Sequence, residues 1–325
     1  MVVSRAVIQV KGLKKYFPVR KGFLRKAVGW IKAVDGVDLD IDEGKTLGLV
    51  GESGCGKTTI GRLILKLLEP DKGKIIYGGR DISRLSPNEM KPIRKQMQII
   101  FQDPFSSLNP AMTVGQSIEE GLRVSKTMNP VERKDRVNQL LKMVGMTPSA
   151  ADLFPHEFSG GQRQRIGVAR ALSVDPSLII CDEPVSALDV SIQAQVINLL
   201  RDLQANMGLS YLFISHDLNV VGYVSDRVAV MYLGHIMEYA GVDEIYDKPF
   251  HPYTRALLSA IPKTRHVGPR KIQTLRGDVP SAYNPPPGCK FQGRCPLVED
   301  RCRQEEIRFY SVGENHLVRC WKTVA

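Results

Sequence analysis

The sequence predicts an α/β protein whose core is a mainly parallel sheet. Short apolar segments of strand length recur along the chain, and stretches with helical spacing of apolar residues separate them. A glycine-rich segment, GESGCGKT at 51–58, lies between one of these strands and the following helix. Buried strands that alternate with helices are typical of a parallel sheet covered by helices.

The elements are expected in a regular order. The start, MVVSRAVIQVKG, alternates like a strand and lacks the apolar region of a signal peptide, so we expect the protein to stay in the cytosol. A helix is predicted from Thr58, and 103–175 has the pattern of a helical insertion, with SIEEGLRV and RKDRVNQLLKMVG as its clearest helices. The other predicted strands are 46–50, 74–79, 96–102, 177–183, 211–215 and 227–233.

After about residue 261 the composition changes. The segment becomes polar and basic, then proline-rich at NPPPG, and it carries four of the six cysteines. We therefore predict one domain over 1–260 and a separate small module over 261–325.

Composition excludes several classes of protein. With 325 residues, 43% apolar and 24% charged, the chain has the make-up of a globular protein of about two domains, and no apolar run is long enough to span a membrane. The net charge of +11 would suggest a nucleic-acid partner. However, residues 1–33 hold nine basic and no acidic side chains, which leaves only +2 for the rest. This segment fits a solvated basic face, or a contact with anionic lipid, a nucleotide or nucleic acid; no RNA- or DNA-binding signature supports the last.

The segment 51–58 matches the phosphate-binding pattern G-x-x-x-x-G-K-[ST]. Its backbone N–H groups would surround phosphates, Lys57 would reach the β- and γ-oxygens, and the Thr58 hydroxyl would bind Mg²⁺. The predicted nucleotide-binding residues here are Gly51, Glu52, Ser53, Gly54, Cys55, Gly56, Lys57, Thr58 and Thr59.

Two carboxylates end the strand SLIICDE. Asp182 is placed to hold Mg²⁺, and Glu183, one residue on, to polarise an attacking water. Two acids at a strand end can also be merely solvated, but the phosphate-binding loop in the same chain favours the catalytic interpretation.

The segment FSGGQRQ, at 158–164, opens a further helix with a serine and two glycines. We expect the N–H groups at this helix N-terminus and the serine hydroxyl to form a second anion site. Placed between the other two motifs, the segment resembles the signature of ATP-binding cassette (ABC) ATPases, whose four matching positions are Ser159, Gly160, Gly161 and Gln162.

This resemblance covers about residues 7–260. It implies a P-loop ABC ATPase with a RecA-like core, an antiparallel β subdomain and a helical subdomain, plus a small cysteine-bearing C-terminal extension. It also implies ATP and Mg²⁺ as ligands, and an ATP held between the loop of one subunit and the signature of another. Four further positions match the family pattern. The resemblance implies that Gln102 would touch Mg²⁺ and the attacking water, and that Asp189 would contact the opposite site. It also implies that His216 would hold the γ-phosphate and that Phe17, next to Tyr16, would stack on adenine.

The chain's ending narrows the resemblance. HPYTRALLSAIP and PPPGCKFQGRCP resemble the C-terminal extension of ATPase subunits in dipeptide/oligopeptide importers, nearer to the second of two paralogous subunits. This implies a paralogous ATPase partner, two transmembrane permease subunits, an extracytoplasmic substrate-binding protein, no nucleic acid, and a place on the cytoplasmic face of the inner membrane. Import of nickel or another small solute, an exporter cassette, and a soluble ABC ATPase acting on nucleic acid remain alternatives. The basic loop RKGFLRKAVGW would face acidic lipid or the permease.

The cysteines form two groups. Cys55 and Cys181 fit packing positions. The other four occur within 32 residues: Cys289, Cys295, Cys302 and Cys320. Free thiols, a Zn²⁺ site and an iron–sulfur cluster are all compatible with their spacing, which lacks the paired CxxC of structural zinc, and a redox-sensing role is a further alternative. The family resemblance implies a [4Fe-4S] cluster.

Overall fold

The computed structural model describes residues 6–21, 26–103, 108–125, 128–261, 277–278 and 280–323. The chain divides into two compact units. The first unit contains Asp42–Lys45 and Leu85–Ile214, and the second unit contains Ala6–Ile41, Thr46–Arg84 and Ser215–Ala325.

Parallel strands form the centre of the first unit. Strand β7 pairs with β6 on one side and with β8 on the other, in the register that places Cys181 beside Ile100 and Phe213. Every residue of β7 and β8 is buried, as expected for strands covered on both faces. The strands are β6 (Met97–Ile100), β7 (Leu178–Asp182) and β8 (Ser210–Ser215).

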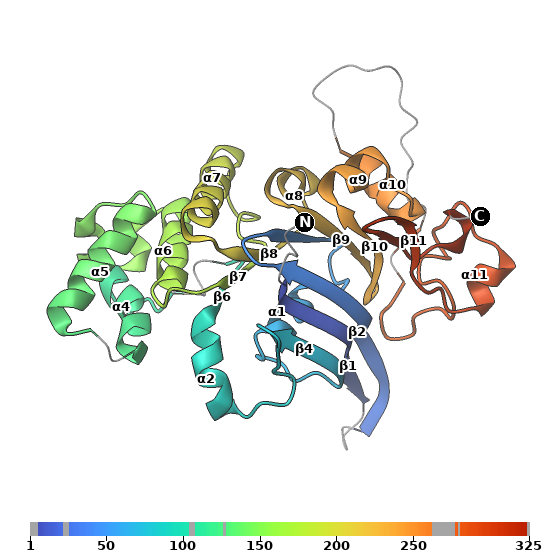
Figure 1. Ribbon diagram of the computed structural model, residues 1–325, viewed down its shortest axis with the longest axis horizontal. Coiled ribbons are helices and arrows are strands. Elements are labelled where there is room, and N and C mark those ends of the chain that lie inside the picture. Colours follow the sequence, from blue (N-terminus) through green and yellow to red (C-terminus); the bar gives the residue numbers. More distant parts are fainter. Residues whose placement is uncertain are drawn as a thin grey trace, which may run out of the picture. The chain divides into compact units, whose positions relative to one another are not determined.

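Helices make up most of the rest of the first unit. Figure 1 shows α4, α5 and α6 packed together in the green part of the chain. Capping boxes begin several of these helices, among them Ser86 with Glu89 and Asn129 with Glu132. The helices are α2 (Pro87–Gln96), α4 (Val114–Ser125), α5 (Pro130–Met143), η1 (Pro148–Asp152), η2 (Pro155–Glu157), α6 (Gly160–Leu172) and α7 (Val190–Met207). The described residues from 108 to 172 contain helices and no strand.

The second unit contains two sheet regions. One has the strand order β2-β1-β4-β5, with β4 antiparallel to both β1 and β5. The other runs β11-β12-β10-β9-β3, in which only the β3–β9 pair is parallel. The strands are β1 (Ala6–Lys21), β2 (Lys26–Asp42), β3 (Thr46–Val50), β4 (Lys72–Tyr77), β5 (Arg80–Asp81), β9 (Arg227–Tyr232), β10 (His235–Gly241), β11 (Tyr310–Gly313) and β12 (His316–Val318).

Short helices accompany these strands. Helix α8 packs on β3, and α9 and α10 pack on β10, next to which they lie in Figure 1. The helices of this unit are α1 (Lys57–Ile64), α8 (Leu218–Val224), α9 (Val242–Asp247), α10 (Pro252–Ser259), α11 (Asp300–Gln304) and η3 (Trp321–Thr323).

One sequence expectation is wrong. The segment RKGFLRKAVGW was predicted to be a loop, but Arg20 and Lys21 belong to β1, and Lys26–Trp30 belong to β2. Residues 22–25 lie outside the described part. The start of β2 is exposed on both faces, so it lacks the alternation of buried and exposed residues by which a strand is recognised in a sequence.

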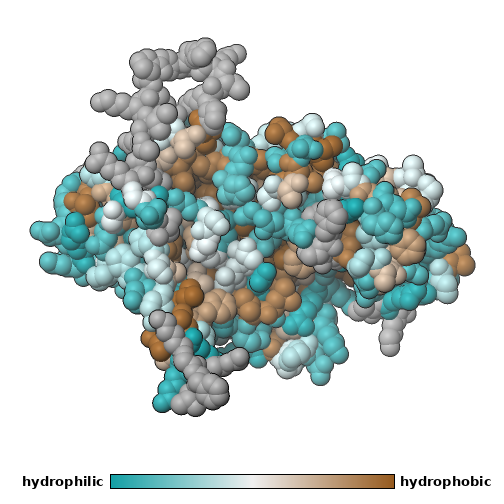
Figure 2. Space-filling view, turned by 180° about the vertical axis from the view of Figure 1, so that it is seen from behind, coloured by the Kyte–Doolittle hydropathy of each residue, from teal (hydrophilic) through white to brown (hydrophobic). Residues whose placement is uncertain are grey.

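The surface carries scattered apolar side chains. Figure 2 shows hydrophobic residues between hydrophilic ones on the face it displays. Val28 and Trp30, two residues apart on β2, are among the exposed large apolar side chains. Among the described residues, no helix combines the length and the apolar character needed to cross a bilayer.

Candidate functional site

The glycine-rich loop connects β3 to α1 within the second unit. Gly56 caps α1 with φ 113°, in the left-handed region that favours glycine. A Cβ at this position would lie 2.1 Å from the carbonyl oxygen of Ala33. A larger residue at Gly56 would therefore displace the loop from the backbone behind it.

Lys57 is folded back over this loop. Its Nζ donates to the carbonyl oxygens of Gly51 at 2.7 Å and Glu52 at 3.2 Å, and the side chain is buried. Cys55 is also buried, and burial raises the pKa of its thiol. The neutral Cys55 side chain fits the predicted packing role.

Glu52 has partners that the sequence did not indicate. Its carboxylate pairs with Arg294, and its backbone N–H donates to the hydroxyl oxygen of Tyr253 at 3.0 Å. These residues are 242 and 201 positions away along the chain. No motif or spacing could have connected them to the loop.

The acidic pair lies at the end of β7 in the first unit. The side chain of Asp182 is buried, while Glu183 adopts φ 49°, a left-handed conformation uncommon for a residue with a side chain. The Glu183 N–H donates to the carbonyl oxygen of Ile214 at 3.0 Å, which anchors this conformation to β8. Non-glycine residues in such conformations cluster at functional sites.

The structure brings Gln102 to Glu183. Strand β6 ends two residues before Gln102, whose Nε2 donates to Oε2 of Glu183 at 3.2 Å. Parallel pairing of β6 with β7 places the carboxyl ends of both strands at the same edge. Two predicted site residues, 81 positions apart, therefore meet there.

The predicted signature segment forms the N-terminus of α6. Ser159 and Gln162 make a capping box: the Ser159 N–H donates to Gln162 Oε1 at 2.9 Å, and the Gln162 N–H donates to Ser159 Oγ at 3.4 Å. Within this turn, the Gln162 N–H and the Ser159 hydroxyl oxygen are therefore paired with each other. The Gln162 N–H is taken up because the side chain of a serine at the N-cap accepts from the third residue of the helix, and the Gln162 side chain accepts the Ser159 N–H in return.

The two glycines of this segment allow close packing. A Cβ on Gly161 would lie 2.3 Å from Cγ2 of Ile192 on α7, and one on Gly160 would lie 3.3 Å from Leu188. Asp189 caps α7 but makes no capping hydrogen bond with its side chain. The signature and the segment around Asp189 are thus adjacent within the first unit.

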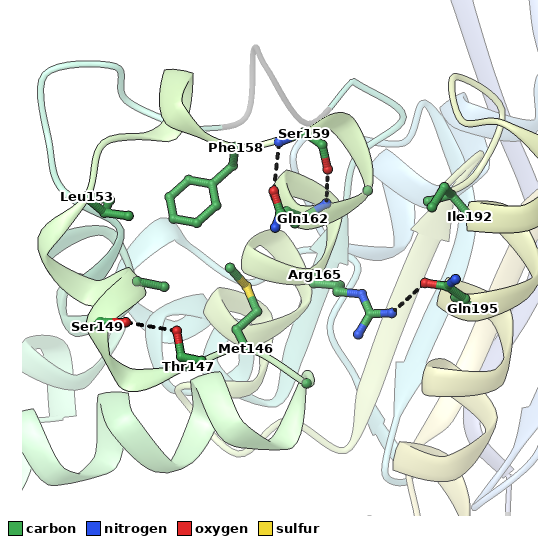
Figure 3. A pocket seen from close by; sticks show the side chains of 13 residues that line it. Met146, Thr147, Ser149, Leu153, Phe158, Ser159, Gln162, Arg165, Ile192 and Gln195 are labelled. Atoms are coloured by element: carbon green, nitrogen blue, oxygen red, sulfur yellow. Dashed lines mark hydrogen bonds between the residues drawn. The ribbon is translucent and has the colours of Figure 1, made fainter.

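A pocket of about 400 Å³ opens beside the signature (Figure 3). Ser159 and Gln162 line one side, and Phe158, Leu153 and Met146 contribute apolar surface. Across the pocket, Arg165 Nη2 donates to Gln195 Oε1 at 3.1 Å. This volume is within the range of small-molecule sites.

The other predicted nucleotide-binding residues of the loop, Ser53, Gly54, Thr58 and Thr59, belong to the second unit. Phe17 and His216 belong to the same unit. His216 follows β8 directly and precedes α8. On β1, the Tyr16 hydroxyl donates to Oδ1 of Asp35, and the Lys32 ammonium lies 5.7 Å from the centre of its ring. The Lys15 ammonium lies 5.7 Å from the centre of the Phe17 ring.

The four C-terminal cysteines line one small cavity. Its volume is about 20 Å³, and its wall also includes His251 and Trp321. Burial raises the pKa of Cys289 to about 12. Among the described residues, no three His, Cys, Asp or Glu side chains are placed to hold a single metal ion. The geometry of the described residues therefore gives no support to a metal site at these cysteines, whether for Zn²⁺ or for a [4Fe-4S] cluster.

Comparison with known proteins identifies the family. The ABC transporter family model matches residues 34–186, and the model of the oligopeptide/dipeptide transporter C-terminal region matches 237–302. The chain is 52% identical to the oligopeptide transport ATP-binding protein AppF of Bacillus subtilis over 320 residues, which cover 98% of this chain and 97% of that one. It is 50% identical to OppF of Salmonella typhimurium, with coverages of 92% and 91%.

A solved structure agrees with this assignment. The dimeric ATP-binding cassette MJ0796, bound to ADP and Pi, superposes with a TM-score of 0.64 at 28% identity, covering 72% of this chain and 98% of that one. The P-loop ABC ATPase fold expected from the sequence is confirmed. The chain belongs to the ATP-binding proteins of ABC transporters and carries the C-terminal region of the oligopeptide/dipeptide transporters.

Proposed function

We propose that this chain is the ATP-hydrolysing subunit of an ABC importer and couples ATP binding and hydrolysis to the uptake of di- and oligopeptides. The observation that carries the proposal is the match, over 98% of the chain, with an oligopeptide transport ATP-binding protein at 52% identity. The match of 237–302 to the oligopeptide/dipeptide transporter region supports peptide over nickel as the cargo. As a family member, the chain is an ATPase.

The phosphate-binding loop and the acidic pair are assigned different roles in binding Mg·ATP. We assign the backbone of 51–56 and the Lys57 ammonium to the phosphates. Mg²⁺ prefers hard oxygen ligands, which the Thr58 hydroxyl, the Asp182 carboxylate and the Gln102 amide oxygen would supply. When bound, the ion would neutralise charge on the β- and γ-phosphates.

Glu183 is assigned as the group that polarises the attacking water. Two observations support this role: its constrained backbone, anchored to Ile214, and its hydrogen bond with Gln102. A carboxylate fixed in this way is pre-oriented for proton transfer, because its rotation is restricted before substrate binds. His216 is assigned to hold the γ-phosphate.

The signature is assigned to the ATP of a second cassette. The pocket beside Ser159 and Gln162 supports this role, since part of its wall is the N-terminus of α6, where the helix dipole favours anions. Asp189 and the exposed Val190 after it would contact the same partner. We propose a paralogous ATPase as that partner, with two permease subunits, a substrate-binding protein outside the membrane, and a peripheral position on the cytoplasmic face.

Phe17 is assigned to the adenine ring. Neighbouring residues of a strand point to opposite faces. The hydroxyl of Tyr16 is bound by Asp35, and the hydrogen bonds of Tyr16 and Lys14 keep the pKa of that carboxyl low although burial alone would raise it. Tyr16 is thus fixed within the second unit, which favours Phe17 as the stacking residue.

The four C-terminal cysteines are assigned to a [4Fe-4S] cluster. The support for this assignment is that all four cysteines line one cavity, since cysteine thiolates are the ligands of such clusters. Cys289→Ser with Cys295→Ser should remove iron from anaerobically purified protein. Cys181→Ala, in β7, is the matched control and should keep it. Equal iron content in both variants would refute the assignment.

Purification from membranes tests the function. A tagged chain should co-purify with hydrophobic permease subunits, and a strain lacking the chain should regain uptake of labelled peptide from the wild-type gene but not from Lys57→Ala. Restored uptake of nickel without uptake of peptide would contradict the proposed cargo. Salt-sensitive DNA or RNA binding without a permease would contradict transport itself.

A further inference from the structure

Two residues of the C-terminal region, Arg294 and Tyr253, form hydrogen bonds with Glu52 of the phosphate-binding loop. Arg294 Nη1 donates to Oε2 at 2.7 Å and Nη2 donates to Oε1 at 3.0 Å, a bidentate arrangement that fixes both groups in orientation. The hydroxyl oxygen of Tyr253 accepts the Glu52 N–H at 3.0 Å. The side chain and the backbone of this loop residue are therefore both held from outside the loop.

Arg294 is the more deeply buried member of the Arg294–Glu52 ion pair. The Arg294 side chain is 7% exposed and that of Glu52 is 25% exposed. Arg294 Nε is buried and has no hydrogen-bond partner, so the pairing of this guanidinium rests on its two terminal nitrogens. Loss of one member of a buried pair costs far more than loss of a surface pair.

Arg294 and Tyr253 share a rigid support. Phe291 packs against Tyr253 and Tyr232, with ring centres 5.3 and 5.4 Å away. The Arg294 N–H donates to the carbonyl oxygen of Phe291 at 3.0 Å, and the Cys289 N–H to that of Cys302 at 2.8 Å. The segment that presents Arg294 is therefore tied to the aromatic cluster and to the cysteine region.

Glu52 in turn is coupled to the phosphate-binding lysine. Lys57 Nζ donates to the carbonyl oxygen of Glu52, within the same loop. A shift of the Glu52 backbone would change the position of this carbonyl and of the neighbouring N–H groups. Such small displacements strongly affect binding, because the loop acts through fixed backbone geometry.

We propose that Arg294 and Tyr253 are positioning residues that hold Glu52, so that the C-terminal region of this chain sets its affinity for ATP. The inference rests on the proposed function, in which the loop binds ATP. It extends that function by assigning the C-terminal region a direct effect on the nucleotide site.

Binding of Mg·ATP to the purified full chain, measured by calorimetry, tests the inference. Arg294→Gln should raise the Kd about tenfold, as expected for a lost charge-assisted bond. Tyr253→Phe should raise it about fivefold, since it removes one hydrogen bond and changes no charge. Arg294→Lys, which keeps the charge without the bidentate geometry, should lie between Arg294→Gln and the wild type.

Arg301→Gln is the matched control, because it breaks an exposed pair with Glu305 in the same region. Its Kd should equal that of the wild type. All measurements are made well below the unfolding temperature, where a merely structural loss would lower Tm but leave Kd unchanged. Wild-type Kd values for both Arg294→Gln and Tyr253→Phe would overturn the inference. If Arg294→Gln does not fold, a wild-type Kd for Tyr253→Phe, which keeps the buried ring, is enough to overturn it. Failure of the wild-type chain to bind ATP would instead contradict the proposed function.

Discussion

Gln102 donates a hydrogen bond from Nε2 to Oε2 of Glu183, at a distance of 3.2 Å. The contact joins the end of β6 to the end of β7, and it holds one oxygen of the carboxylate that we assign to the attacking water. The neutral amide orients this carboxylate without adding charge. Any change that places charge at Gln102 should therefore act on Glu183.

Gln102→Glu should lower the rate of ATP hydrolysis more than Gln102→Ala does. Both changes remove the donor to Oε2 of Glu183, but only the glutamate places a second negative charge beside that carboxylate. Rates at saturating Mg·ATP compare the two variants with the wild type. Equal rates in the two variants would show that charge at position 102 does not act on Glu183.

Gly161→Ala should destabilise the chain. The new Cβ would lie 2.3 Å from Cγ2 of Ile192, and overpacking of this kind costs about 1–3 kcal/mol in the free energy of unfolding. Gly167, on the same helix α6, has open space around it, and Gly167→Ala should stabilise the chain by about 0.5–1 kcal/mol. Urea unfolding compares the two variants. Equal stability would show that the signature glycine is not needed for the packing of α6 on α7.

His251 should make the chain sensitive to mild acid. Burial lowers the pKa of His251 to about 4, with Arg319 and Arg255 acting in the same direction and Glu238 against it. Its Nδ1 accepts the Tyr253 N–H, a bond that protonation would remove. Below about pH 6.5 the unfolded chain takes up a proton that the folded chain does not. The free energy of unfolding should fall between pH 6.5 and 4, by on the order of 3 kcal/mol.

His251→Asn is the corresponding variant. Asparagine keeps an oxygen that can cap α10 and does not titrate. Urea unfolding at several pH values should show a shallower loss of stability in this variant than in the wild type over the same interval. If the free energy of unfolding falls equally with pH in the variant and in the wild type, His251 is not the cause of the loss of stability.

Sequence and structure agree best where the information is local. The strand–loop–helix unit around Lys57 and the acids after β7 are runs of consecutive residues, and the sequence sufficed to predict them. The contact of Gln102 with Glu183 depends on the order of strands in the sheet, which neighbouring residues do not encode. The pairing of Arg294 with Glu52 spans 242 positions and has no sequence pattern at all. The exposed start of β2 was missed because neither face is buried.

The central claim is that ATP hydrolysis by this chain drives peptide uptake. The most direct measurement is ATP hydrolysis and labelled-peptide uptake by the assembled transporter in vesicles, with wild-type chain and with Glu183→Gln. The amide keeps the shape of the side chain but cannot accept the proton, so hydrolysis should fall about 10²–10⁴-fold while ATP binding persists, and uptake should fall with it. Uptake at the wild-type rate in the Glu183→Gln transporter would contradict the account.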